Sequence, residues 1–189
     1  MKQIFRRATA ILLLLLFQQL LFAQINLERY KITNDISIKI PTSFISMTER
    51  EIISKYVSYR QPIGMFTSED RQVDLGINKN STPWAGNDLD ILKDFYKANI
   101  QNLFTEVKFL KEEIREISGR EYVLFEFISK VSDEDKTFGG LSGPVGKYTY
   151  IMYTLYEENV LLFNFTCDIQ ARAQWQSTAG EIMESVRIK

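Results

Sequence analysis

The chain has 189 residues, of which 25% are charged, and it contains no histidine. This length gives room for one domain with a core of its own. The formal net charge of −1 argues against nucleic acid as a partner, because nucleic-acid binding needs a basic excess. Without histidine, Ser–His and Cys–His nucleophile pairs and histidine metal sites are excluded. Carboxylate-only chemistry stays open, but no two acids fall in one predicted pocket. We therefore expect a protein that is not an enzyme and has no cofactor.

Residues 1–23 have the pattern of a secretory signal peptide, with a basic start, an apolar run over 11–17 and a small residue, Ala23, at the end. The alternative is a membrane anchor, but about 16 residues interrupted by two glutamines fall short of the roughly 20 that a span needs. We expect cleavage between Ala23 and Gln24 and a single domain over 24–189. Cleavage would leave 20 basic and 24 acidic residues, a net charge of −4, and an exported protein without a membrane span, periplasmic or extracellular.

In the first third of the domain, residues 24–29 read as an exposed lead-in and 30–33 as a first strand. A half-buried strand follows over 36–40, where three isoleucines alternate with polar residues, and Pro41 ends it. Thr48 and Glu51 form a capping box, which predicts a short helix over 49–57 that buries Ile52, Ile53 and Tyr56.

Further along, the pattern predicts strands over 62–67 and 73–77, a polar loop over 78–88 and a helix over 88–104 capped by Asn87. The buried stripe of this helix is expected to be Leu89, Leu92, Tyr96, Ile100 and Leu103, with Phe95 and Phe104 beside it. Strands over 107–117 and 122–131 follow, joined by a turn at 118–120. A loop over 132–146 comes next, and the last helix is expected over 170–185.

Residues 147–167 read as one long β-hairpin around a polar turn at 157–159, and neither arm has a polar face. Side chains alternate across a strand, so a strand that is apolar on both sides needs cover on both sides. The hairpin therefore predicts an α+β fold: an α/β/α sandwich whose mainly antiparallel central sheet is covered by helices on both faces. The single cysteine, Cys167, alternates with apolar residues and reads as a small buried side chain.

The two long loops hold the candidate binding residues, because loops on a rigid scaffold usually carry function. Trp84 and Phe138 are the aromatic candidates for anchoring a partner. Asn78 and Asn87 would supply polar groups to a pocket near Trp84. The plainer interpretation of Trp84 is that it folds back over the end of the sheet. The acids at 133–135 lack the twelve-residue calcium-loop pattern, so we expect no metal site.

The order of these pieces resembles the PsbP-like superfamily, which has the Mog/PsbP fold, and especially its small secreted bacterial members of the DcrB-like kind. The resemblance covers residues 30–188 and rests on the layout together with an opening Pro41-Thr42-Ser43-Phe44 and a closing Ser185-Val186. Ile182 stands where an aromatic residue is common in the family. The resemblance implies a noncatalytic protein that binds or assists another envelope protein, and it carries over no ligand residue. A small-ligand or carbohydrate-binding module is the alternative.

Overall fold

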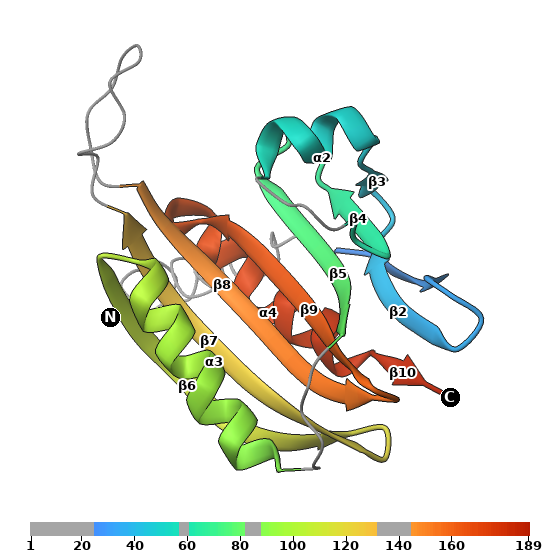
Figure 1. The fold of residues 1–189 in the computed structure, drawn as a ribbon. Helices are drawn as coiled ribbons and strands as arrows, with labels where there is room; N and C mark the ends of the chain where they lie inside the picture. Colours follow the sequence, from blue (N-terminus) through green and yellow to red (C-terminus); the bar gives the residue numbers. More distant parts are fainter. Residues whose placement is uncertain (1–24, 57–60, 82–87, 132–144) are drawn as a thin grey trace, which may run out of the picture.

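The computed structural model describes residues 25–56, 61–81, 88–131 and 145–189. Its centre is an antiparallel sheet with the strand order β3-β4-β5-β9-β8-β7-β6 (Figure 1). The strands are β3 (Ile45–Ser46), β4 (Gly64–Thr67), β5 (Val73–Ser81), β6 (Glu106–Ile117), β7 (Arg120–Val131), β8 (Val145–Tyr156) and β9 (Asn159–Asp168). The predicted hairpin is β8–β9, and it lies inside the sheet with β5 on one side and β7 on the other.

A second, smaller sheet has the order β1-β2-β10, with β1 (Leu27–Lys31) and β10 (Arg187–Ile188) on either side of β2 (Ile36–Pro41). The isoleucines of β2 are buried against the large sheet, as their alternation predicted. Strand β1 begins at Leu27, so residues 27–29 of the expected lead-in belong to a strand, although Glu28 and Arg29 are exposed as expected. These residues pair with the edge of β2 in antiparallel register.

One face of the large sheet is covered by the small sheet together with α4 (Arg172–Glu184), which follows the 3-10 turn η3 (Ile169–Ala171). Trp175 of α4 fixes this cover, because its ring lies 5.5 Å from the Phe44 ring and 5.9 Å from the Phe165 ring between centroids. Helix α3 (Leu89–Leu103) covers the other face, where Tyr96 stacks on Tyr153 at 3.7 Å. The predicted α+β fold is confirmed.

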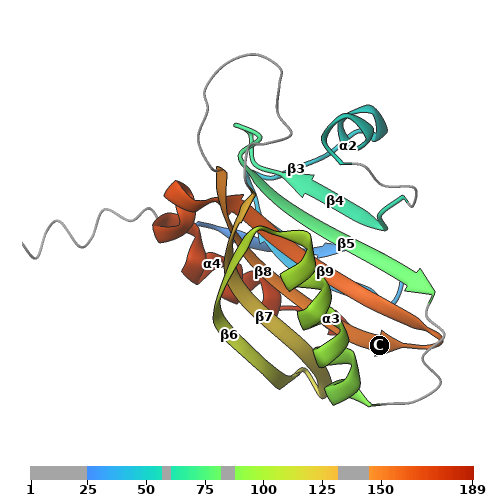
Figure 2. The same cartoon turned by 60° about the vertical axis from the view of Figure 1, so that its left-hand side comes forward.

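Helix α2 (Glu49–Lys55) has the predicted capping box, but it buries less than predicted. Ile53 is 68% exposed, while Ile52 and Tyr56 are half-buried. The reason is position: α2 lies at the β3–β4 end of the sheet and α3 at the β6–β7 end, so α2 touches the sheet with one side only (Figure 2). Among the helices of the described residues, none is long and apolar enough to cross a membrane.

Helix α3 also departs from two expectations. Its N-cap is Asp88 and not Asn87, because the Asp88 carboxylate accepts hydrogen bonds from the amides of Asp90 and Ile91, at 3.1 Å each. Leu103, expected in the buried stripe, is 72% exposed, and at this end of the helix Phe104 packs against the sheet in its place. The predicted loop over 78–88 starts later than expected, because β5 stays paired with β9 as far as Ser81.

Cys167 is buried in the core, and burial raises the pKa of its thiol from 9.0 to about 11. We expect Cys167→Ser to lower the free energy of unfolding by about 1–3 kcal/mol at pH 7, because a hydroxyl replaces an apolar group. The contribution of the neutral thiol is complete below pH 9 and is lost as the pH rises through 11, so the difference from wild type should shrink over that interval. Urea unfolding at several pH values checks this, with Cys167→Ala as the apolar control. A serine variant as stable as wild type at pH 7 would contradict the assignment.

Candidate functional site

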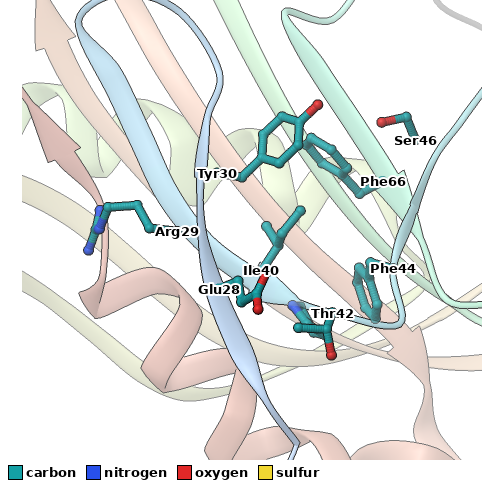
Figure 3. A pocket seen from close by; sticks show the side chains of 9 residues that line it. Glu28, Arg29, Tyr30, Ile40, Thr42, Phe44, Ser46 and Phe66 are labelled. Atoms are coloured by element: carbon teal, nitrogen blue, oxygen red, sulfur yellow. The ribbon is translucent and has the colours of Figure 1, made fainter.

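The described surface has more than two hollows, and the first lies beside β1. This edge cleft is a cavity of about 220 Å³ between the small sheet and the β3–β4 end of the large sheet. It is lined by Glu28, Arg29, Tyr30, Ile40, Pro41, Thr42, Phe44, Ser46 and Phe66 (Figure 3).

The floor of the edge cleft is the protein core itself. Ile40, Phe44 and Phe66 all belong to the main buried cluster, yet they line an opening to solvent. Tyr30 reaches across from β1 and meets Phe66 edge to face, with the ring centroids 5.1 Å apart. Tyr30 is nevertheless 46% exposed, so half of a large ring stays in water above an apolar floor. A further apolar group placed here would gain contact area on both Tyr30 and the floor.

The charges around the edge cleft are unequal. Figure 3 shows the Arg29 side chain turned away from the cavity. Its two terminal nitrogens donate to the Ser185 carbonyl at 3.0 and 3.1 Å, which ties β1 to the end of α4. Burial, and then the neighbouring Arg187, lower the pKa of Arg29 from its ordinary value. Of the charged groups that line the cleft, this leaves Glu28 at the opening.

The second hollow, here called the α2 hollow, has a cavity of about 220 Å³ on the face of the sheet that also carries α3. It is lined by Ile52, Tyr56, Pro62, Met65, Gly76, Asn78 and Asn164. Met65, Gly76 and Asn164 stand in one row across β4, β5 and β9. The missing side chain of Gly76 makes the room, because a Cβ there would lie 3.1 Å from the Met65 sulfur.

A buried polar cluster holds the wall of the α2 hollow in place. Asp74, 4% exposed, accepts a hydrogen bond from Thr67 at 2.7 Å and another from the Tyr56 hydroxyl, and the Lys55 ammonium lies 2.6 Å from its carboxylate. Burial and the bond to Asp74 raise the pKa of Tyr56 far above its usual value, so its phenol is protonated at neutral pH. Asp74 is thus fully engaged in tying α2 to the sheet.

Asn164 is the unusual residue of the α2 hollow. Its Oδ1 is buried and has no hydrogen-bond partner, although buried acceptors normally have one. Asn78, half-buried on β5, brings a second amide to the same hollow beside the apolar side chains of Ile52 and Met65. The hollow therefore offers neutral donors and acceptors, and an apolar wall, to whatever enters it.

Of the sequence-predicted site residues, Asn78 is the one that the structure describes, and it lies in the α2 hollow. Trp84, Asn87 and Phe138 lie outside the described residues, as do Ala23 and Gln24. Sequence reasoning missed Tyr30 and Asn164. Asn164 had a signal, since it is an amide in the middle of an apolar strand, whereas nothing in the sequence placed Tyr30 over Phe66. Within the described ranges, no three metal-binding side chains lie together.

No protein-family model matches the sequence, and no curated protein does. Solved structures do match the fold. Cyanobacterial PsbP (CyanoP) from Synechocystis sp. PCC 6803 is 15% identical, with a TM-score of 0.58 over 87% of this chain and 94% of its own. LpqN of Mycobacterium tuberculosis is 12% identical, with a TM-score of 0.55 over 88% of this chain and 92% of its own. The Ran-binding protein Mog1p of Saccharomyces cerevisiae is 11% identical, with a TM-score of 0.53 over 87% of this chain and 96% of its own. The predicted Mog/PsbP fold is confirmed, and likenesses this distant establish the fold alone.

We expect Asn164→Leu to raise the free energy of unfolding by about 1–3 kcal/mol, because it removes a buried acceptor that has no partner. Denaturant unfolding of the purified domain measures this. Asn78→Leu is the matched control: its amide has no such orphan atom, so the change should stay within about 0.5 kcal/mol. A loss of stability in Asn164→Leu would mean that the amide holds the fold together.

Proposed function

We propose that this chain, which has the fold of PsbP and Mog1p, is a noncatalytic exported protein that binds another protein of the cell envelope as an accessory or assembly factor. The observation that carries the proposal is the edge cleft, where Tyr30 stands half-exposed over the buried Phe44 and Phe66. Energetically dominant contacts in protein interfaces are usually large rings that close over a desolvated pocket. The edge cleft offers both parts, an apolar floor and an exposed ring beside it.

The state of the buried acids supports a role without catalysis. A general base needs a carboxylate that is free to take a proton from a substrate. Asp74 is bound by Lys55, Thr67 and Tyr56. Glu126, 4% exposed, accepts hydrogen bonds from Tyr148 at 3.1 Å and from Gln176. Both carboxylates are committed to the structure, and the chain has no histidine to replace them.

The neighbours in fold give weaker support. Mog1p is described as a Ran-binding protein, and LpqN as involved in cell envelope biogenesis. A binding role agrees with the first description, and a place in the envelope agrees with the second and with the signal peptide that residues 1–23 predict. A small-ligand or carbohydrate-binding role is the second candidate, favoured by the two amides and the open acceptor of the α2 hollow.

Affinity capture from envelope extract with the domain that begins at Gln24 tests the main proposal. We expect a specific protein to be retained by the wild type and lost with Tyr30→Ala, because truncating the ring removes the cover of the cleft. Leu103→Ala is the matched control, since Leu103 is an exposed apolar residue of α3, at the β6–β7 end of the sheet. Retention that depends on Trp84, and not on Tyr30, would move the contact surface to the loop that the sequence predicted. If no protein is retained and a glycan array gives a hit that Asn164→Leu abolishes, the second candidate is correct.

Export is tested by the mass of the mature protein. We expect the protein purified from its native cells to begin at Gln24, because the apolar run of the leader is too short to remain as a membrane span. Intact-mass spectrometry of an envelope fraction measures this directly. A chain that retains residues 1–23 would refute the cleavage, and a chain recovered only from the cytoplasm would refute the export.

A further inference from the structure

Strand β1 has an unpaired edge. In an antiparallel ladder, alternate residues turn their backbone N–H and C=O groups toward the partner strand and the residues between turn them away. The Thr42 amide donates to the Asn26 carbonyl at 3.0 Å, and the Ile32 amide donates to the Ile36 carbonyl at 2.9 Å, so the even-numbered residues of β1 face β2. Leu27, Arg29 and Lys31 therefore direct their backbone groups away from β2, where no described strand pairs with them.

The outer face of the small sheet is basic. Ile36, Ile38 and Ile40 point into the core, so the residues between them point outward with their partners across the sheet. In one row Lys31 is opposite Ser37, and Ser37 is opposite Arg187; in the next row Arg29 is opposite Lys39. The outward positions that stay open to solvent are Arg29, Lys31, Ser37, Lys39 and Arg187, and none of them is acidic, whereas Pro41 is buried and Leu27 packs against the core.

These cations have no ionic partners in the described part of the chain. Lys31, Lys39 and Arg187 are exposed and form no ion pair there, although many other basic residues do. Like charges directly opposite each other, such as Arg29 and Lys39, destabilise a sheet. A plain reason for charge here is protection, since lysines keep an exposed strand edge from pairing. Charge of either sign would protect the edge, however, whereas the charges on this face are all positive although the chain has a net negative charge.

The inner face of β1 is different. Glu28 and Tyr30 point to the same side as the β2 isoleucines, and they line the edge cleft above Phe44 and Phe66. A strand added to the free edge of β1 would place every second side chain on this inner side. Those side chains would extend the apolar cover of the edge cleft, and the side chains between them would lie on the basic outer face.

We propose that β1 binds an extended segment of the partner protein by strand addition, and that the segment alternates apolar residues, which enter the edge cleft, with acidic residues, which meet the basic outer face. This rests on the proposed function and names the chemistry of the partner. Hydrogen bonds to the free backbone groups of β1 would give affinity for any extended segment, and the two different faces would make the binding specific for this alternating pattern. A second copy of this chain fits poorly, because two basic edges would face each other.

A ten-residue probe that alternates valine with glutamate, with a fluorophore at one end, tests the chemistry by anisotropy titration. We expect saturable binding that weakens with salt. Two control peptides keep most of the probe: one groups the same valines and glutamates in two blocks, and one replaces glutamate by lysine. Both should bind at least about tenfold more weakly, since one loses the alternation and the other reverses the charge. Equal binding of the block peptide would overturn strand addition.

The edge itself is tested with Lys31→Pro and its partner variant Lys31→Gln. Proline removes the outward N–H of residue 31 and leaves the hydrogen bonds between β1 and β2 intact, whereas glutamine removes the charge alone. We expect glutamine to weaken the probe modestly and proline to abolish its binding, with both variants folded as judged by circular dichroism and melting temperature. If the Lys31→Pro variant binds the probe as tightly as the Lys31→Gln variant does, the proposal is overturned.

Two further results separate this inference from its alternatives. Vesicles with anionic lipid that bind the wild type and Lys31→Pro equally, while the probe does not bind, would assign the basic face to a membrane surface and overturn strand addition. If the capture experiment retains a protein through Tyr30 but the alternating probe does not bind, the proposed function stands and strand addition is wrong. If the probe binds but Tyr30→Ala has no effect on it, the segment does not enter the edge cleft and the proposal fails.

Discussion

The hairpin β8–β9 has apolar side chains on both faces, and the rest of the fold is the cover that this requires. Tyr148, Met152 and Phe163 look toward α4 and the small sheet, while Ile151, Tyr153 and Val160 look toward α3. One strand pair thus belongs to both buried clusters. Trp175 and Tyr96 are the rings that fasten the two covers, one from α4 and one from α3.

Helix α3 covers only part of its face of the sheet, and the strands become more polar where this cover ends. Under α3 the sheet is apolar. Toward β5 and β9 the same face changes to Asp74, Gly76, Asn164 and Thr166, with α2 reaching it from the far end of the sheet. A short helix without a buried residue could not stay there by apolar contact alone. The Lys55–Asp74 pair and the Tyr56 hydrogen bond hold it, and the α2 hollow remains beneath.

On the opposite face, the small sheet extends past the part of the large sheet that it covers. Strand β2 is buried and β10 closes one of its sides, so β1 is left as an edge with Tyr30 overhanging Phe66. Arg29 binds this edge to the end of α4 through Ser185, across 156 residues of sequence. The edge strand is thus tied to the end of α4 and stands above an opening in the core.

The sequence by itself determined the elements and their inner and outer faces. The two-sided hairpin, the capping box at Thr48, the turn at Ser118 and Gly119 with positive φ, and the buried cysteine were all readable, because they depend on neighbours a few residues away. Tertiary structure decided what covers each face. The pairing of β5 with β9, the exposure of Ile53 and Leu103, the orphan acceptor of Asn164 and the edge cleft all arise between segments far apart in the chain. Periodicity shows which side of a strand is apolar, but burial is a property of the distant segment that packs on it.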